Sequence, residues 1–158
     1  MRKTILIPGL LLALCLLLGG CVKTVDAPQP DKTCAQWADA VQAAADFREL
    51  TDMTEKHLEK NLLISVNDLE DWVMRRDASR VTPEMILIVK VKAGADQAAV
   101  KQAFQSYNQE LLDSNRNYQP DQVYMLENAK AVENGPFVAL IVSPDAEKTS
   151  AALGSGWK

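Results

Sequence analysis

One short segment constrains the fold more than any other part of the chain. Residues 84–92, EMILIVKVK, form the clearest strand pattern, and the first half of this strand is apolar on both faces. A strand with this pattern is typical of the middle of a sheet. Ala93-Gly94-Ala95 then breaks the strand, and Asp96 is placed to cap a long helix. We therefore expect a core that is built on a sheet with residues 84–92 at its centre.

The other elements lie before and after this strand in a regular order. Thr33 and Gln36 form a capping-box pattern for a first helix, and Thr51 or Thr54 is expected to cap a second one. Asn134-Gly135 is the strongest hairpin signal, because both residues tolerate a positive φ. The expected helices are 33–50, 54–62, 96–115 and 144–153, and the expected strands are 68–76, 84–92, 129–133 and 137–143. This order, α-α-β-β-α-β-β-α, predicts a two-layer α+β domain with an antiparallel four-stranded sheet and helices packed on one face.

The N-terminus has the pattern of a bacterial export signal. A positive start at Arg2 and Lys3 precedes an apolar run over residues 5–18, which is too short to cross a bilayer as a stable helix. Small residues follow, and the sequence Leu-Gly-Gly-Cys ends at Cys21. This lipobox pattern predicts cleavage between Gly20 and Cys21 and attachment of lipid to the Cys21 thiol.

These signals divide the chain into four parts. We expect a signal peptide at 1–20, a lipidated cysteine and short proline-containing tether at 21–32, one α+β domain at 33–154 and a loose tail at 155–158. The predicted location is the outer face of the cytoplasmic membrane, with lipid on Cys21 as the membrane contact. An alternative is ordinary secretion with a Cys21–Cys34 disulfide. Otherwise Cys34 is a buried small residue, a reactive thiol or half of an intermolecular disulfide.

Composition excludes several classes of function. The formal net charge is −4, which argues against nucleic acid or anionic lipid as a partner, since both attract concentrated basic patches. No hydrolase, phosphate-binding or dinucleotide-binding motif is present, and the single histidine, His57, leaves no metal ligand set. We therefore expect a protein that is not an enzyme and has no metal or cofactor. The remaining enzymatic hypothesis is a hydrolase that uses the acids of the first strand, namely Asp68, Glu70 and Asp71.

Two groups of residues are candidates for binding. Arginine recognises anionic groups through paired hydrogen bonds, and three arginines surround the turn after the first strand: Arg75, Arg76 and Arg80. The alternative is that they pair with the neighbouring acids Asp77, Glu70 or Asp71. The second group is Tyr118, Tyr124 and Asn128, which lie in a segment expected to be irregular. Aromatic residues there can stack on sugars or anchor a protein partner, or they can pin the loop to the sheet.

The chain also resembles a known family. Three stretches carry the resemblance: DLEDWVMRRDAS at 68–79, EMILIVKVKAGADQAAVKQAF at 84–104 and YQPDQVYMLENAKAVENGPFVALIVSPD at 118–145. They are similar to lipoproteins of Gram-positive gut bacteria that are catalogued as domain of unknown function 4358. The most specific block contains Tyr118, Pro120, Tyr124, Glu127, Asn128 and Ala129, followed by the hairpin and Ser143. Phe137 stands where the family pattern has tyrosine, so a role for that hydroxyl does not transfer.

The resemblance adds an expectation about context. It implies an extracytoplasmic lipoprotein of small α+β fold, with no assigned activity, cofactor or catalytic residue. It also implies an accessory role in surface-polysaccharide modification, because such proteins are often encoded beside membrane-bound O-acyltransferases.

Together, these observations predict a non-enzymatic binding or accessory module that meets an envelope protein or glycan. The alternative is a lipoprotein that binds a sugar or metabolite. The identity of the ligand and the oligomeric state stay open.

Overall fold

The computed structural model describes residues 32–158. The predictions for the signal peptide, for Gly20 and Cys21, and for the tether up to residue 31 lie outside the described residues. Within the described range, no helix has both the length and the apolar character needed to span a membrane.

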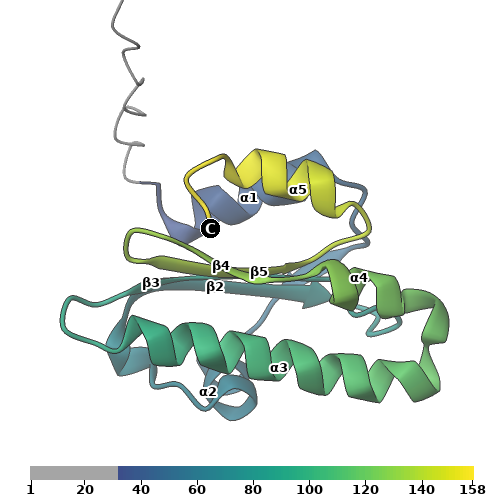
Figure 1. Ribbon diagram of the computed structural model, residues 1–158, viewed down its shortest axis with the longest axis horizontal. Coiled ribbons are helices and arrows are strands. Elements are labelled where there is room, and N and C mark those ends of the chain that lie inside the picture. The colour runs from purple at the N-terminus through teal and green to yellow at the C-terminus, as the bar shows by residue number, and fades with distance from the viewer. Residues whose placement is uncertain (1–31) are drawn as a thin grey trace, which may run out of the picture. The chain divides into compact units, whose positions relative to one another are not determined.

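The described chain folds into three layers, with the sheet in the middle (Figure 1). One face of the sheet carries α1 (Cys34–Ala44) and α5 (Ala146–Leu153). The other face carries α2 (Glu55–Leu62), α3 (Gln97–Tyr118) and α4 (Val123–Asn128). Two short 3₁₀ turns, η1 (Val66–Asp68) and η2 (Pro120–Gln122), precede β2 and α4.

The sheet contains five antiparallel strands in the order β1-β2-β3-β5-β4. The strands are β1 (Leu50–Asp52), β2 (Leu69–Asp77), β3 (Met85–Val91), β4 (Ala131–Asn134) and β5 (Phe137–Val142). The central position of β3 confirms the prediction from its apolar pattern. The hairpin at Asn134-Gly135 is also confirmed, with Gly135 at φ +54°.

The prediction of helices on one face was wrong, and β3 shows the reason. Leu87 and Val89 contribute to the core under α3, whereas Ile86 and Ile88 contribute to a second core under α1. All four side chains are fully buried. Because both faces of β3 are apolar, both must be covered, and the domain has three layers rather than two.

The four-strand prediction was also wrong, because β1 was missed. The first helix ends at Ala44 instead of residue 50, and Leu50–Asp52 then pair with Asp77, Arg76 and Arg75 of β2. The capping box at Thr33 and Gln36 is present as predicted. The segment expected to be irregular, 116–128, is largely helical, since α3 continues to Tyr118 and α4 follows.

The last residues do not form the loose tail that the sequence predicted. Lys158 exchanges two backbone hydrogen bonds with Glu133 of β4, at 2.9 and 3.0 Å. The Trp157 ring packs edge-on against Trp37 of α1, with ring centroids 5.6 Å apart, and lies 6.3 Å from the ring of Phe137. The folded domain therefore continues beyond residue 154 to Lys158.

Candidate binding groove

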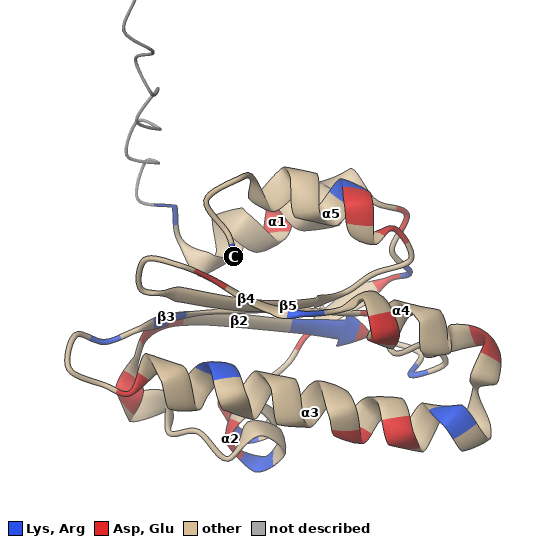
Figure 2. Ribbon diagram, in the orientation of Figure 1, with Lys and Arg blue, Asp and Glu red and all other residues tan. Residues whose placement is uncertain are grey.

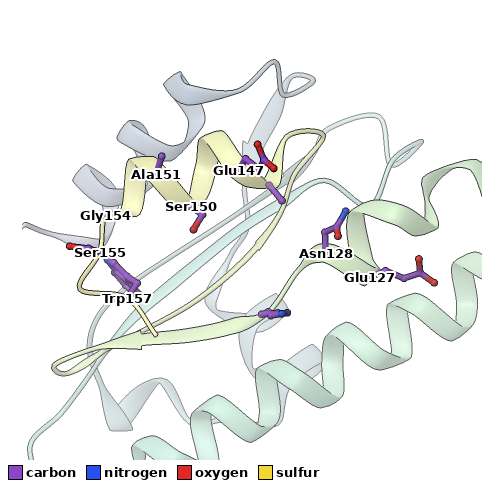
Figure 3. Close-up of a pocket in the computed structure, with 10 residues that line it drawn as sticks. Glu127, Asn128, Glu147, Ser150, Ala151, Gly154, Ser155 and Trp157 are labelled. Atoms are coloured by element: carbon purple, nitrogen blue, oxygen red, sulfur yellow. The ribbon is translucent and has the colours of Figure 1, made fainter.

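A groove opens on the α1–α5 side of the sheet, where helical cover ends. α1 packs on β2 and β3, and α5 has only eight residues, so the strand β4 at the sheet edge is partly uncovered. The groove runs between α5 and the α4–β4 connection and has a volume of about 810 Å³ (Figure 3). A deeper part of about 150 Å³ lies under α5. The larger volume falls in the range of small-molecule sites.

The deeper part of the groove is mainly apolar. Its walls include Val132 of β4, Ile141 of β5 and Leu153 of α5. Val132 and Ile141 are only partly buried, although they pack against the core under α1. The groove therefore exposes apolar sheet surface that a longer final helix would have covered.

Trp157 closes one end of the groove, and Asn128 lies near the other (Figure 3). The Trp157 indole is held by the rings of Trp37 and Phe137, so its orientation is set before any ligand arrives. Its Nε1 atom is buried and has no hydrogen-bond partner among the described residues. Lys32, the first described residue, places its Nζ 4.2 Å from the centroid of the Trp37 ring.

The rim of the groove is polar. Asn128 and Glu127 end α4, Lys130 leads into β4, and Glu147 and Ser150 project from α5 (Figure 3). All five residues are exposed. Two carboxylates and one ammonium group give this rim a net negative charge of one.

The Arg75 side chain does not face the groove and is engaged elsewhere. Its guanidinium donates to Asp39 at 2.7 Å, to Gln42 at 3.0 Å and to Asp52 at 3.0 Å, and so connects α1, β1 and β2. Burial alone would lower the pKa of Arg75, but the hydrogen bonds to Asp39 and Asp52 raise it above its ordinary value. Arg75 therefore has a structural role, because it links α1 to the sheet.

The three arginines do not form a cluster. Adjacent strand residues point to opposite faces, so Arg76 lies on the α3 side of β2, where its guanidinium donates to the Tyr107 hydroxyl at 3.3 Å. Arg80 is exposed in the β2–β3 turn, with φ +59°. Figure 2 shows the basic stretch near the end of β2. Among the described residues, Arg75 pairs with Asp39 and Asp52 rather than with Asp77, Glu70 or Asp71, the acids suggested as alternative partners.

Two of the three acids proposed for a hydrolase, Glu70 and Asp71 of β2, contact neighbouring elements. The Asp71 carboxylate accepts hydrogen bonds from the backbone N–H of Cys34 at 2.7 Å and of Trp72 at 2.8 Å. Glu70 pairs with Lys90 at 2.9 Å, and Asp68 is exposed in η1. In the described part of the chain, no group of three or more acidic, histidine or cysteine side chains is arranged to hold a metal ion.

Cys34 is free and fully buried, which confirms its interpretation as a small core residue. Burial raises the pKa of the Cys34 thiol, and the nearby Asp71 carboxylate raises it further. The thiol is therefore protonated at neutral pH, which is unfavourable for a nucleophile.

The two tyrosines are solvent-exposed rather than packed under the loop. The exposed fraction is 84% for Tyr118 and 46% for Tyr124. Of the three sequence candidates in this segment, only Asn128 lines the groove. Sequence reasoning missed the other groove residues, and the one available signal was a tryptophan, Trp157, in a segment assigned to a tail.

The described chain is thus a three-layer α+β domain with a groove at one edge of its sheet. The sequence model of DUF4358, a domain of unknown function, matches residues 43–143. The chain belongs to this family. The match runs from the end of α1 to the residue after β5, so α5 and Trp157 lie outside it. No curated protein and no solved structure matches the chain.

Proposed function

We propose that this protein is a lipid-anchored, extracytoplasmic binding module without catalytic activity, which engages a protein or glycan of the cell envelope. The observation that carries the proposal is the groove between α5 and β4, with its apolar floor, ordered tryptophan and polar rim. Concave surfaces that combine apolar walls with a few hydrogen-bonding groups are typical of binding sites. The lipobox pattern at Gly20 and Cys21 supports the anchor.

The arrangement of the domain suits a role close to a membrane. Lys32, where the described chain begins, contacts Trp37, and Trp37 contacts the Trp157 ring that closes the groove. The groove and the start of the domain therefore lie in the same layer. If Cys21 carries lipid, a stretch of ten residues such as 22–31 limits the distance between the domain and the bilayer to at most about 35 Å.

Photo-cross-linking in native membranes tests this function. A photoreactive residue in place of Ser150, on the groove side of α5, should give a discrete adduct with an envelope component. The matched control places the same residue at Gln105, which is exposed on α3 in the opposite layer. Adduct formation should also be lost, and the protein released from the membrane fraction, when Cys21→Ser removes the lipid acceptor.

Two results would contradict the proposal. Equal labelling from positions 150 and 105 would show that the groove is not the contact surface. Retention of Cys21→Ser in the membrane fraction would show that lipid on Cys21 is not the anchor.

A further inference from the structure

We propose that the groove binds a saccharide chain that is either uncharged or carries amino groups, and that it rejects anionic saccharides. This inference rests on the proposed binding function and specifies the chemical class of its ligand. It follows from three properties of the groove: its aromatic surface, its unpaired hydrogen-bonding groups and its charge.

An aromatic surface lies at one end of the polar rim. Trp157 lines the groove at the end away from Asn128 (Figure 3). Sugar rings present C–H groups on their faces and hydroxyls at their edges. Such rings pack on an aromatic surface while their hydroxyls reach polar neighbours. Because Trp157 is already held by Trp37 and Phe137, little side-chain entropy is lost when a ligand packs on it.

The hydrogen-bonding groups of the groove are available to a ligand. The side chains of Asn128, Ser150 and Glu127 are exposed, and none forms a side-chain hydrogen bond within the described residues. An amide, a hydroxyl and a carboxylate together supply both donors and acceptors, which match the alternating roles of sugar hydroxyls. The buried Nε1 of Trp157 lacks an acceptor, and a hydroxyl that enters the deeper part of the groove would provide one.

The charge of the rim selects among saccharides. Glu127 and Glu147 line the groove. Among the described residues, Lys130 is the only basic residue that lines it. An anionic sugar would bring a carboxylate or phosphate toward two carboxylates, whereas an amino group would be attracted.

The sheet edge beside the groove favours a saccharide over an extended peptide. Peptides commonly bind such edges by adding a strand through backbone hydrogen bonds. Here the outward-facing N–H and C=O of Glu133 are already paired with Lys158. Strand addition at β4 would have to displace this pairing, whereas contacts through the rim side chains leave it intact.

Titration calorimetry of the full-length protein in detergent micelles tests the inference. The probes are a neutral hexamer of N-acetylglucosamine, the corresponding hexamer of glucosamine, and hexagalacturonate as the anionic member. The first two should bind and the third should not. Asn128→Ala should weaken binding by about threefold to tenfold, the usual effect of losing one hydrogen bond. Tyr118→Ala, which removes an exposed tyrosine outside the groove lining, should leave affinity unchanged.

The outcomes separate this inference from the proposed function. If position 150 cross-links to an envelope protein and none of the hexamers binds, the saccharide inference is wrong and the binding module stands. Preferential binding of hexagalacturonate would overturn the charge argument. Equal affinity for wild type and Asn128→Ala would overturn the assignment of the groove, provided that circular dichroism shows an unchanged fold.

Discussion

Asp77 at the end of β2 organises the β2–β3 turn, and replacing it with asparagine should lower the free energy of unfolding by about 2 kcal/mol at neutral pH. The residue is only 3% exposed. Its carboxylate accepts hydrogen bonds from the Ser79 hydroxyl at 2.7 Å and from the backbone N–H groups of Ser79 at 2.9 Å and Thr82 at 2.8 Å. The Thr82 hydroxyl and the Val81 N–H donate to it as well, at 3.0 and 3.1 Å. An amide cannot accept all of these bonds with its NH₂ group.

The magnitude follows from the pKa of this carboxyl group. Burial alone would raise the pKa of Asp77, but the hydrogen bonds from Ser79 and Thr82 outweigh burial and lower it from 3.8 to about 2. That difference corresponds to about 2.5 kcal/mol at 1.36 kcal/mol for each pKa unit, and the expected loss is about 2 kcal/mol because the amide oxygen of asparagine still accepts some of these hydrogen bonds. The folded-state pKa lies below the unfolded-state pKa. The stabilisation is therefore fully present above pH ~4 and is lost as the pH falls toward 2, with about half gone at pH 3.

Urea unfolding of wild type and Asp77→Asn between pH 7 and pH 3 measures this contribution. The difference between the two proteins should be largest at pH 7 and should shrink with acid. Asp121→Asn, at an exposed position in η2, is the matched control and should change stability by less than about 0.5 kcal/mol. A difference at Asp77 that is this small, or that does not depend on pH, would refute the reasoning.

Three further predictions concern the core and the C-terminal segment. Ile88→Ala should lower the free energy of unfolding, measured in urea, by about 3 kcal/mol, because this side chain is fully buried between the sheet and α1. A loss of less than about 1 kcal/mol would contradict the burial of this face of β3 under α1. Cys34 should resist thiol reagents in the native protein and react after unfolding, since it is buried and its pKa is raised. Rapid labelling of the native state would contradict this arrangement. Trp157→Ala should lower the free energy of unfolding by about 2 kcal/mol through loss of its ring contacts, whereas a loose tail would show almost no change.

Local signals in the sequence predicted the elements whose residues interact over short distances. The capping box at Thr33 and Gln36 and the hairpin at Asn134-Gly135 both depend on residues close together in the chain, and both are present. The long α3 helix begins after its predicted cap, Asp96, whose side chain accepts from the Ala99 N–H. The burial of Cys34 agrees with its helical spacing to Trp37.

Elements that depend on distant partners were missed. β1 has three residues, Leu50-Thr51-Asp52, and no apolar pattern, so only its pairing with β2 defines it as a strand. The partners of Arg75 come from α1 and β1, both far from it in the sequence. The apolar residues on both faces of β3 did indicate that both faces are buried, but they did not indicate which helices pack on each face.

Local patterns in the sequence predict the α+β class of the domain, its central strand and most of its helix starts, because caps, turns and apolar periodicity act between neighbouring residues. Packing between distant segments sets the three layers of the domain and the place of Trp157 in the fold. The same packing leaves a groove where α5 ends over β4. These features depend on how far each helix reaches across the sheet, and that depends on packing between segments up to a hundred or more residues apart, such as Trp37 and Trp157.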